Sequence, residues 1–243
     1  MPKTKKIVNL PLVALRGKVI FPQTSNVFDA GRLISLTAIS RASERDMTLF
    51  VSMQKDAEKD EIVPEDICKV GTVVKIKQIG KLPSNNLRIN VEGLYRAKAE
   101  EIYEENGCFF ANVSELKAVH GDAVLEEAYF RTAQDVMRDI QMSDMRFPKE
   151  GAAALENITD PDAYIGNALS FLHIKEDVKQ KILETTKTVE RLKIFERCLN
   201  DELEIAKLEK KISATVRQNI DKNQKEYFLR EQLKAIHTEL GDD

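Results

Sequence analysis

The sequence lacks the residues that mark a disulfide-stapled or membrane-embedded protein. Of its 243 residues none is tryptophan and only three are cysteine, with no two of them spaced as a CxxC pair. No apolar run approaches the ~18–20 residues of a membrane-spanning helix, and the early run from Ile7 to Leu15 is interrupted by Asn9 and Pro11. These absences exclude a disulfide scaffold and favour a reduced, cytoplasmic protein without a membrane segment.

The motifs of common catalytic and cofactor sites are also missing. A nucleotide-binding P-loop needs two glycines five positions apart, and no two of the ten glycines have that spacing. The sequence contains no GxSxG, HExxH or GxGxxG pattern. Its histidines, His120, His173 and His237, lie on separate segments, and Cys68 stands beside Asp66, whose charge opposes a thiolate. We therefore expect no catalytic residue, no cofactor site and no metal site in this chain.

A strong positive field is absent as well. The net charge is −3, with a balance of +3 over residues 1–119 and of −6 over the remaining 124 residues. Sequence-independent DNA binding normally needs a much more basic surface. Four basic side chains do fall on one predicted hairpin, residues 74–92, and they leave a nucleic-acid-binding module open as the alternative reading: Lys75, Lys77, Lys81 and Arg88. The polar face of that hairpin lacks the aromatic residues on which single-stranded bases stack.

Glycine and proline are both absent from residues 167–240, a length that helices tolerate and β-structure does not. The first half instead alternates apolar and polar residues, as in the run from Leu87 to Glu92. We predict strands in the 74–92 hairpin, with a bulge or bend at Gly93, and in further short runs at 19–21, 49–51 and 108–113. One helix is predicted between the strands at 19–21 and 49–51, because Leu33, Leu36, Ile39 and Ala42 recur every third residue.

The second half has helical periodicity throughout. Apolar residues from Leu125 to Ile140 recur every three or four positions, Asp160-Pro161 is a typical helix start, and another helix begins near Lys175. A final helix runs from Thr188 to Leu240, about 80 Å at 1.5 Å per residue. Its apolar stripe has imperfect coiled-coil spacing, and a small bundle cannot cover its whole length. Its far end therefore needs a partner.

Two groups of apolar residues fall in segments that we expect to be exposed. Met142, Met145 and Phe147 lie in a stretch that we interpret as a loop bounded by Pro148 and Gly151. Flexible methionines suit surfaces that accept many partners, although these side chains could also fold back onto the bundle. The second group, Tyr227, Phe228 and Leu233, ends the long helix. Phe21-Pro22, with Phe28 nearby, is a further apolar feature that we assign to a strand and the core.

The sequence resembles the amino-terminal region of the bacterial Lon protease family, ATP-dependent AAA+ serine proteases. The resemblance is strong because the elements occur in the family's order and because the last of them is long and specific. They are Leu10-Pro11-Leu12, Leu15-Arg16, Val19, Phe21-Pro22, Arg32 with Ser35, Ala38-Ile39, Phe50-Val51, Val91-Glu92-Gly93, Arg96-Ala97, Asp162-Ala163-Tyr164-Ile165, Lys179 to Glu184, and Gln224 to Ile236.

The resemblance implies an α+β architecture. It places a β-rich PUA-like domain with one helix at residues 1–118, a helical bundle at 119–187 and a long helix or coiled-coil stalk at 188–243. The family's ATPase module, with ATP and Mg as cofactors, and its Ser-Lys dyad would lie beyond this chain, so no catalytic residue transfers to a position here.

The function that the resemblance implies is non-catalytic recognition of unfolded or damaged protein substrates, together with assembly. The parent enzyme would be a homohexamer, whereas this chain alone is expected to be a monomer or a weak dimer. Binding of DNA is possible in the family but is not supported by the charge of this chain.

Overall fold

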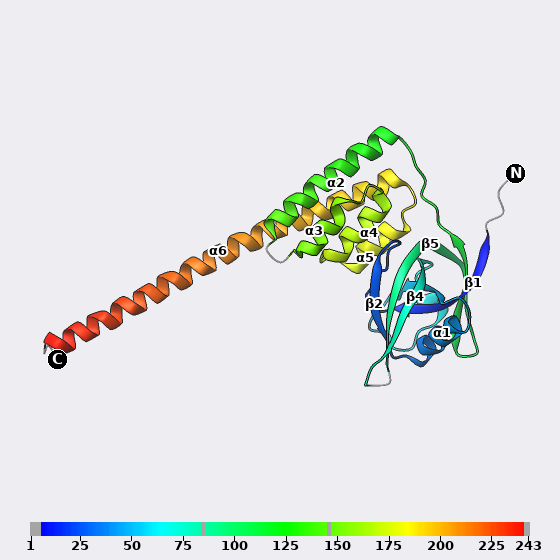
Figure 1. The fold of residues 1–243 in the computed structure, drawn as a ribbon, viewed down its shortest axis with the longest axis horizontal. Helices are drawn as coiled ribbons and strands as arrows, with labels where there is room; N and C mark the ends of the chain where they lie inside the picture. Colours follow the sequence, from blue (N-terminus) through cyan, green and yellow to red (C-terminus); the bar gives the residue numbers. More distant parts are fainter. Residues whose placement is uncertain (1–5, 84–85, 145–146, 241–243) are drawn as a thin grey trace.

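The computed structural model describes residues 6–83, 86–144 and 147–240, and it begins with a six-stranded sheet rolled into a barrel (Figure 1). The strands are β1 (Ile7–Leu15), β2 (Ser25–Ala30), β3 (Thr48–Met53), β4 (Val70–Lys81), β5 (Leu87–Glu105) and β6 (Cys108–Glu115). Helix α1 (Leu33–Ser43) packs on the barrel, and a short 3-10 turn, η1, spans Pro64–Asp66. The predicted hairpin, the predicted helix and the strands near 49–51 and 108–113 are confirmed.

The strand order is β2-β5-β4-β3-β1-β6, and an additional β5–β6 pairing closes the ring. All pairs are antiparallel except β1 with β3. The long β5 makes closure possible, because its first part pairs with β2 and its second part with β6. A register shift opposite Gly93–Tyr95 confirms the predicted bulge, and such bulges bend a strand around a barrel.

Two strand predictions were wrong or incomplete. Residues 19–21 form no strand but belong to the turn-rich connection between β1 and β2, where Gly17 and Gln23 both have positive φ. The run from Ile7 to Leu15 was not assigned to a strand, yet it forms β1. Proline is tolerated there because the β1–β3 pairing begins only at Leu12, so the missing N–H removes no bond on that side.

Five helices follow the barrel: α2 (Ala123–Ser143), α3 (Lys149–Glu156), α4 (Pro161–Phe171), α5 (Glu176–Glu184) and α6 (Thr188–Leu240). Two of them start at aspartate caps, since Asp122 accepts from the N–H of Val124 at 2.9 Å and Asp160 accepts from the N–H of Ala163 at 2.8 Å. All five contribute to one apolar core around Met137, Ile165 and Phe195. The helices predicted at 125–140, at Asp160-Pro161, near 175 and at 188–240 are confirmed. The predicted domain limits at 118 and 187 stay a prediction.

The loop predicted around Pro148 and Gly151 is wrong in part. Met142 lies in the last turn of α2, and Gly151 lies inside α3, where it is buried. A Cβ at Gly151 would stand 3.0 Å from Cδ1 of Phe171, so this glycine permits close packing of α3 on α4 instead of marking a turn. Only the connection between α2 and α3 is non-helical, and Met145 in it lies outside the described residues.

The barrel and the helices are joined through the Phe21-Pro22 segment. Phe21 is buried, and it lies so close to β5 and α4 that a Cβ at Gly93 would meet its carbonyl oxygen at 2.1 Å and one at Gly166 its Cβ at 2.8 Å. Nearby, Arg96 of β5 donates to the carbonyl oxygen of Thr185 at 2.9 Å. Phe21-Pro22 therefore packs between the barrel and the helices. Its predicted place in the core is confirmed, whereas its predicted strand conformation is wrong.

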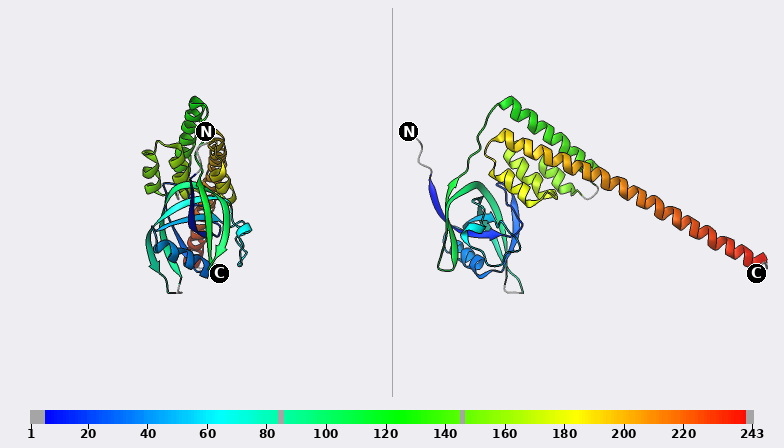
Figure 2. Two further views of the ribbon diagram at one scale, coloured as in Figure 1. Left: turned by 90° about the vertical axis from the view of Figure 1, so that its right-hand side faces the viewer. Right: turned by 180° about the vertical axis from the view of Figure 1, so that it is seen from behind.

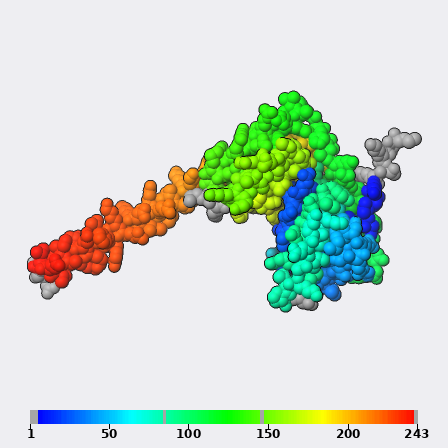
Figure 3. Space-filling view, in the orientation of Figure 1, coloured from blue at the N-terminus to red at the C-terminus, as the bar shows by residue number. Residues whose placement is uncertain are grey.

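Helix α6 is packed at its start and free at its end (Figures 1 and 2). Its last buried residue is Ala206, and every residue from Lys207 to Leu240 is exposed. The space-filling view shows this second half standing clear of the rest of the molecule (Figure 3). Within the described ranges, none of the helices combines the length and apolarity needed to cross a membrane.

Candidate binding surfaces

A groove runs between α2 and the α3–α4 pair, with Met142 at its rim. We call it the α2–α3 groove; its volume is about 520 Å³. Its lining residues are Gln134, Arg138, Gln141, Met142, Ala152, Leu155, Glu156 and Tyr164. Leu155 and Tyr164 are buried, whereas the Met142 residue is 72% exposed. The groove therefore combines an apolar floor, a polar rim and one flexible, exposed thioether.

The floor of this groove is rigid. The Tyr164 ring packs edge-on against Phe130 at 5.2 Å between centroids and against Phe195 at 6.4 Å. Burial raises the pKa of the Tyr164 hydroxyl to about 12, so it stays protonated at neutral pH. On the rim, Arg138 is paired with Asp135. A bound apolar side chain would thus contact a preformed surface, with Met142 free to adjust.

Phe147 is only partly available. Its ring lies 5.9 Å from that of Phe171 and packs on the helical core. Three residues were predicted to form one apolar surface. Of these, the Met142 side chain is exposed and the Phe147 side chain is half-buried, while Met145 is not among the described residues. That they act together stays a prediction.

The free half of α6 carries ten exposed large apolar residues. They are Leu208, Ile212, Val216, Ile220, Tyr227, Phe228, Leu229, Leu233, Ile236 and Leu240. At 3.6 residues per turn, positions 208 to 227 of this set fall within about 120° of one face. The predicted group of Tyr227, Phe228 and Leu233 is different, because successive members are turned by about 100° and about 140°. These three point in separate directions, so one flat partner cannot cover them all.

Two of the four cations on the basic face of the 74–92 hairpin, Lys77 and Arg88, are paired with carboxylates. Arg88 donates to both carboxylate oxygens of Asp29 at 2.8 Å, Lys77 pairs with Glu92 at 2.5 Å, and Lys75 donates to the carbonyl oxygen of Asp46. Cations engaged in this way have less charge to offer a phosphate backbone. The nucleic-acid alternative is not supported.

The cysteines have the environment of core residues. Burial raises the pKa of the Cys108 thiol to about 11 and, to a lesser degree, the pKa values of the Cys68 and Cys198 thiols, which opposes a reactive thiolate. Among the described residues no three His, Cys, Asp or Glu side chains come together as a metal site.

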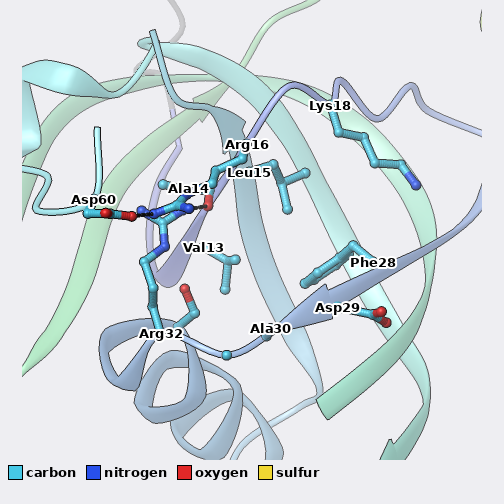
Figure 4. A pocket seen from close by; sticks show the side chains of 12 residues that line it. Val13, Ala14, Leu15, Arg16, Lys18, Phe28, Asp29, Ala30, Arg32 and Asp60 are labelled. Atoms are coloured by element: carbon cyan, nitrogen blue, oxygen red, sulfur yellow. Dashed lines mark hydrogen bonds and ion pairs between the residues drawn. The ribbon is translucent and has the colours of Figure 1, made fainter. Parts of the chain in front are cut away.

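Sequence reasoning missed a cleft of about 540 Å³ at one end of the barrel (Figure 4). It lies between the end of β1 and strand β2, and Arg16, Lys18 and Arg32 contribute to its lining. The only signal in the sequence was that Arg16 and Arg32 belong to the family-like elements. Their charge could not be assigned to a cleft before the two strands were known to stand apart.

The sequence matches the family model of the ATP-dependent protease La (LON) substrate-binding domain over residues 9–201. The Lon protease of Clostridioides difficile (strain 630) is 38% identical over 245 residues, covering 99% of this chain and 31% of that protein. Lon protease 1 of Bacillus subtilis (strain 168) is 35% identical over 234 residues, covering 96% of this chain and 30% of that protein. The chain thus spans less than a third of the length of these curated relatives.

Two solved structures share the fold. The amino-terminal domain of the Mycobacterium avium complex Lon protease superposes with a TM-score of 0.64 at 18% identity, covering 81% of this chain and 98% of that one. A Lon N-terminal domain protein from Xanthomonas campestris gives 0.51 at 16% identity, covering 77% and 96%. These similarities confirm the predicted α+β fold.

Proposed function

Because this chain belongs to the family of Lon protease substrate-binding domains, we propose that it binds apolar segments of unfolded or damaged proteins in the α2–α3 groove. The exposed Met142 above a buried apolar floor supports this proposal. Unfolded proteins display apolar side chains in varied sequences, so their recognition needs an adaptable surface more than a precise pocket. The flexible Met142 side chain above the apolar floor provides such an adaptable surface.

The proposal is tested by substituting Met142. The Met142→Glu variant should bind a reduced, carboxymethylated and permanently unfolded protein about tenfold more weakly, since a charge at the rim opposes apolar contact. The Met142→Leu variant keeps the apolar volume and should bind nearly as well as the parent chain. Thr132→Glu adds the same charge elsewhere on α2, at an exposed position, and is the matched control. Binding is measured by fluorescence anisotropy of the labelled unfolded protein.

Equal binding by the Met142→Glu and Thr132→Glu variants would contradict the proposal, provided that both variants keep the parent's circular dichroism. A Phe147→Leu variant extends the test to the half-buried neighbour. It should change binding less than Met142→Glu does, because most of the ring already packs on Phe171.

The free half of α6 suits a second role, which is self-association. The face formed by Leu208, Ile212, Val216, Ile220 and Tyr227 has no partner among the described residues, and it is long enough for a coiled-coil contact. Sedimentation of the parent chain should show weak, concentration-dependent dimers. The Ile212→Glu variant should shift that equilibrium to the monomer, whereas Ala214→Glu, at an exposed position on the opposite face of the helix, should not.

The activity of the whole protein is an extension of this proposal. The full-length protein would be a cytoplasmic homohexamer that uses ATP and Mg to unfold the captured proteins and cleaves them with a Ser-Lys dyad, in protein quality control. On this view the present chain is not catalytic. Purified, it should neither hydrolyse ATP nor cleave an unfolded protein, and either activity would overturn the assignment.

A further inference from the structure

The barrel is closed at one end and split at the other. Strand β6 covers β1 only from Ile7 to Leu12, so residues 13–15 of β1 have a strand neighbour, β3, on one side alone. Strand β2 is the outer strand of the order, and among the described strands it pairs with β5 alone. The cleft of about 540 Å³ lies between these two open edges (Figure 4).

Backbone groups of both edges point away from the strands with which β1 and β2 pair. The carbonyl oxygen of Thr24 accepts from the N–H of Gly93 in β5, so alternate residues of β2, Val27 and Asp29, turn their N–H and C=O groups to the open side. Val27 is 46% exposed. Across the cleft, the carbonyl oxygen of Ala14 likewise points away from β3. A row of unpaired strand groups is a template for another strand.

Two cations now occupy positions that the N–H groups of an added strand would take. The Lys18 ammonium donates to the carbonyl oxygen of Val27 at 2.5 Å, and the Arg32 guanidinium donates to that of Ala14 at 3.2 Å. Arg32 also donates to Oε1 of Gln54 at 2.9 Å, which holds it in place. Lys18 is the more easily displaced, since among the described residues its ammonium has one hydrogen-bond acceptor, with the charge of Glu176 nearby.

The charge of the cleft is positive. Arg16 and Asp60, which both line it, pair with each other at 2.6 Å, and Asp29 is engaged by Arg88 on the outside. The two remaining cations, Lys18 and Arg32, donate to neutral oxygens, and Glu176 is the main carboxylate near Lys18. Burial, followed by the neighbouring charge of Arg16, lowers the pKa of Arg32, and burial lowers the pKa of Lys18. Crowded, partly desolvated cations of this kind are stabilised by an added carboxylate.

We propose that the split between β1 and β2 binds an extended, acidic segment of another polypeptide as an additional strand on the open edge of β2. A main-chain N–H group of the segment would replace the Lys18 ammonium as the hydrogen-bond donor to the carbonyl oxygen of Val27. The released ammonium would then pair with a glutamate or aspartate side chain of the segment. Apolar side chains on the inward face of the segment would contact Val13, Leu15 and Phe28, which line the cleft.

This site is separate from the α2–α3 groove in location and in recognition chemistry. The groove binds apolar side chains without main-chain hydrogen bonds. The split binds an extended backbone through main-chain hydrogen bonds and a negatively charged side chain through Lys18. The inference goes beyond the proposed function and does not rest on it. Met142→Glu should leave strand binding unchanged, and substitutions in the split should leave groove binding unchanged, so the two proposals fail independently.

The first test uses the parent chain and a labelled eight-residue peptide of alternating valine and threonine with one central glutamate. Replacing that glutamate by glutamine should weaken binding about fivefold. N-methylation of one alternating set of peptide nitrogens should weaken binding about tenfold or more, and N-methylation of the other set should weaken it much less, because only one set faces β2. Equal effects of the two methylated peptides would overturn the proposal, since binding would then not use a strand edge.

The second test changes the protein. Val27→Pro removes an N–H on the open edge of β2 and leaves the β2–β5 bonds in place, so the variant should fold and lose peptide binding at least tenfold. Val27→Thr is the matched control and should bind normally. Lys18→Gln should abolish the preference for the glutamate peptide over the glutamine peptide. Unchanged binding by a folded Val27→Pro variant, or an unchanged glutamate preference in Lys18→Gln, would contradict the inference.

Amide hydrogen exchange on the parent chain completes the experiment without any substitution. The amide of Val27 should exchange freely in the free protein and be protected when the glutamate peptide is added. Protection limited to other parts of the chain would refute strand addition at β2.

Discussion

The two halves of α6 are one continuous helix in opposite environments. Residues 188–206 contribute buried positions to the helical core, whereas residues 207–240 are exposed throughout. Both halves carry large apolar side chains, Phe195 in the first and Phe228 in the second. The first half lies along α2 and next to α5. The difference therefore comes from what surrounds the helix and not from a change in the residues that form it.

This contrast shows what an apolar stripe can and cannot reveal. Helical spacing of apolar residues indicates that a face will be covered, but it does not say by which molecule. In residues 188–206 the covering surface belongs to the same chain. In residues 207–240 the stripe is left for a partner, which is the physical basis of the proposed self-association.

The largest expected difference between the halves is in core packing. Phe195→Ala should lower the free energy of unfolding by about 3–5 kcal/mol, because it removes a fully buried ring that packs near Tyr164. Phe228→Ala removes an exposed ring and should change it by less than about 0.5 kcal/mol. Urea unfolding followed by circular dichroism measures both. Similar losses in the two variants would mean that the free half is packed in solution.

The next difference concerns ion pairs. Asp162 faces two buried guanidinium groups, that of Arg191 at 2.5 Å and that of Arg96 at 3.7 Å. Asp162→Ala should therefore destabilise the protein by about 3 kcal/mol, since it leaves two buried cations without their carboxylate. In the free half, Glu231→Ala breaks an exposed pair with Lys234 and should cost less than about 0.5 kcal/mol. Equal costs would contradict the assignment of buried and free halves.

The smallest effect is a pH dependence at the end of the buried half. Burial raises the pKa of the Glu202 carboxyl. A carboxyl with a raised folded-state pKa binds its proton more tightly in the folded protein, so its stabilising contribution is present below about pH 4.5 and is lost as the pH rises through the folded-state pKa.

Glu202→Gln should accordingly be slightly more stable than the parent chain at pH 7, by less than about 1 kcal/mol, and should lose part of the pH dependence above about pH 4.5. Glu204→Gln, at an exposed position two residues further on, is the control and should match the parent. Thermal unfolding across this pH range measures the effect. A Glu202→Gln variant that is less stable at pH 7 would show that the carboxylate has a favourable partner.

Much of the fold could be predicted because local chemistry decides it. Asp160 caps α4 and Pro161 follows it, and the absence of glycine and proline from residues 167–240 favours helices throughout that stretch. Strand β1 was not predicted, and the tolerance of Pro11 within it depends on where β3 begins to pair. Gly151 was taken for a turn residue because its contact with Phe171 is tertiary.

The binding surfaces were less predictable than the fold. Met142 was found from its residue type, but its place above Leu155 and Tyr164 depends on how α2, α3 and α4 pack. The cleft in the barrel depends on how far two strand pairings extend. The pairing of β6 with β1 stops at Leu12, and the pairing of β2 with β5 runs to Ala30. Neither relation is encoded within one short segment of sequence.

The central claim is that unfolded protein is held at Met142, and photo-crosslinking tests it most directly. A benzophenone side chain is placed at the position of Met142, of Thr132 or of Phe228, and each chain is irradiated with the labelled unfolded protein. The account predicts strong crosslinking from position 142 and little from position 132. Crosslinking from position 228 alone, or equally from 142 and 132, would contradict it.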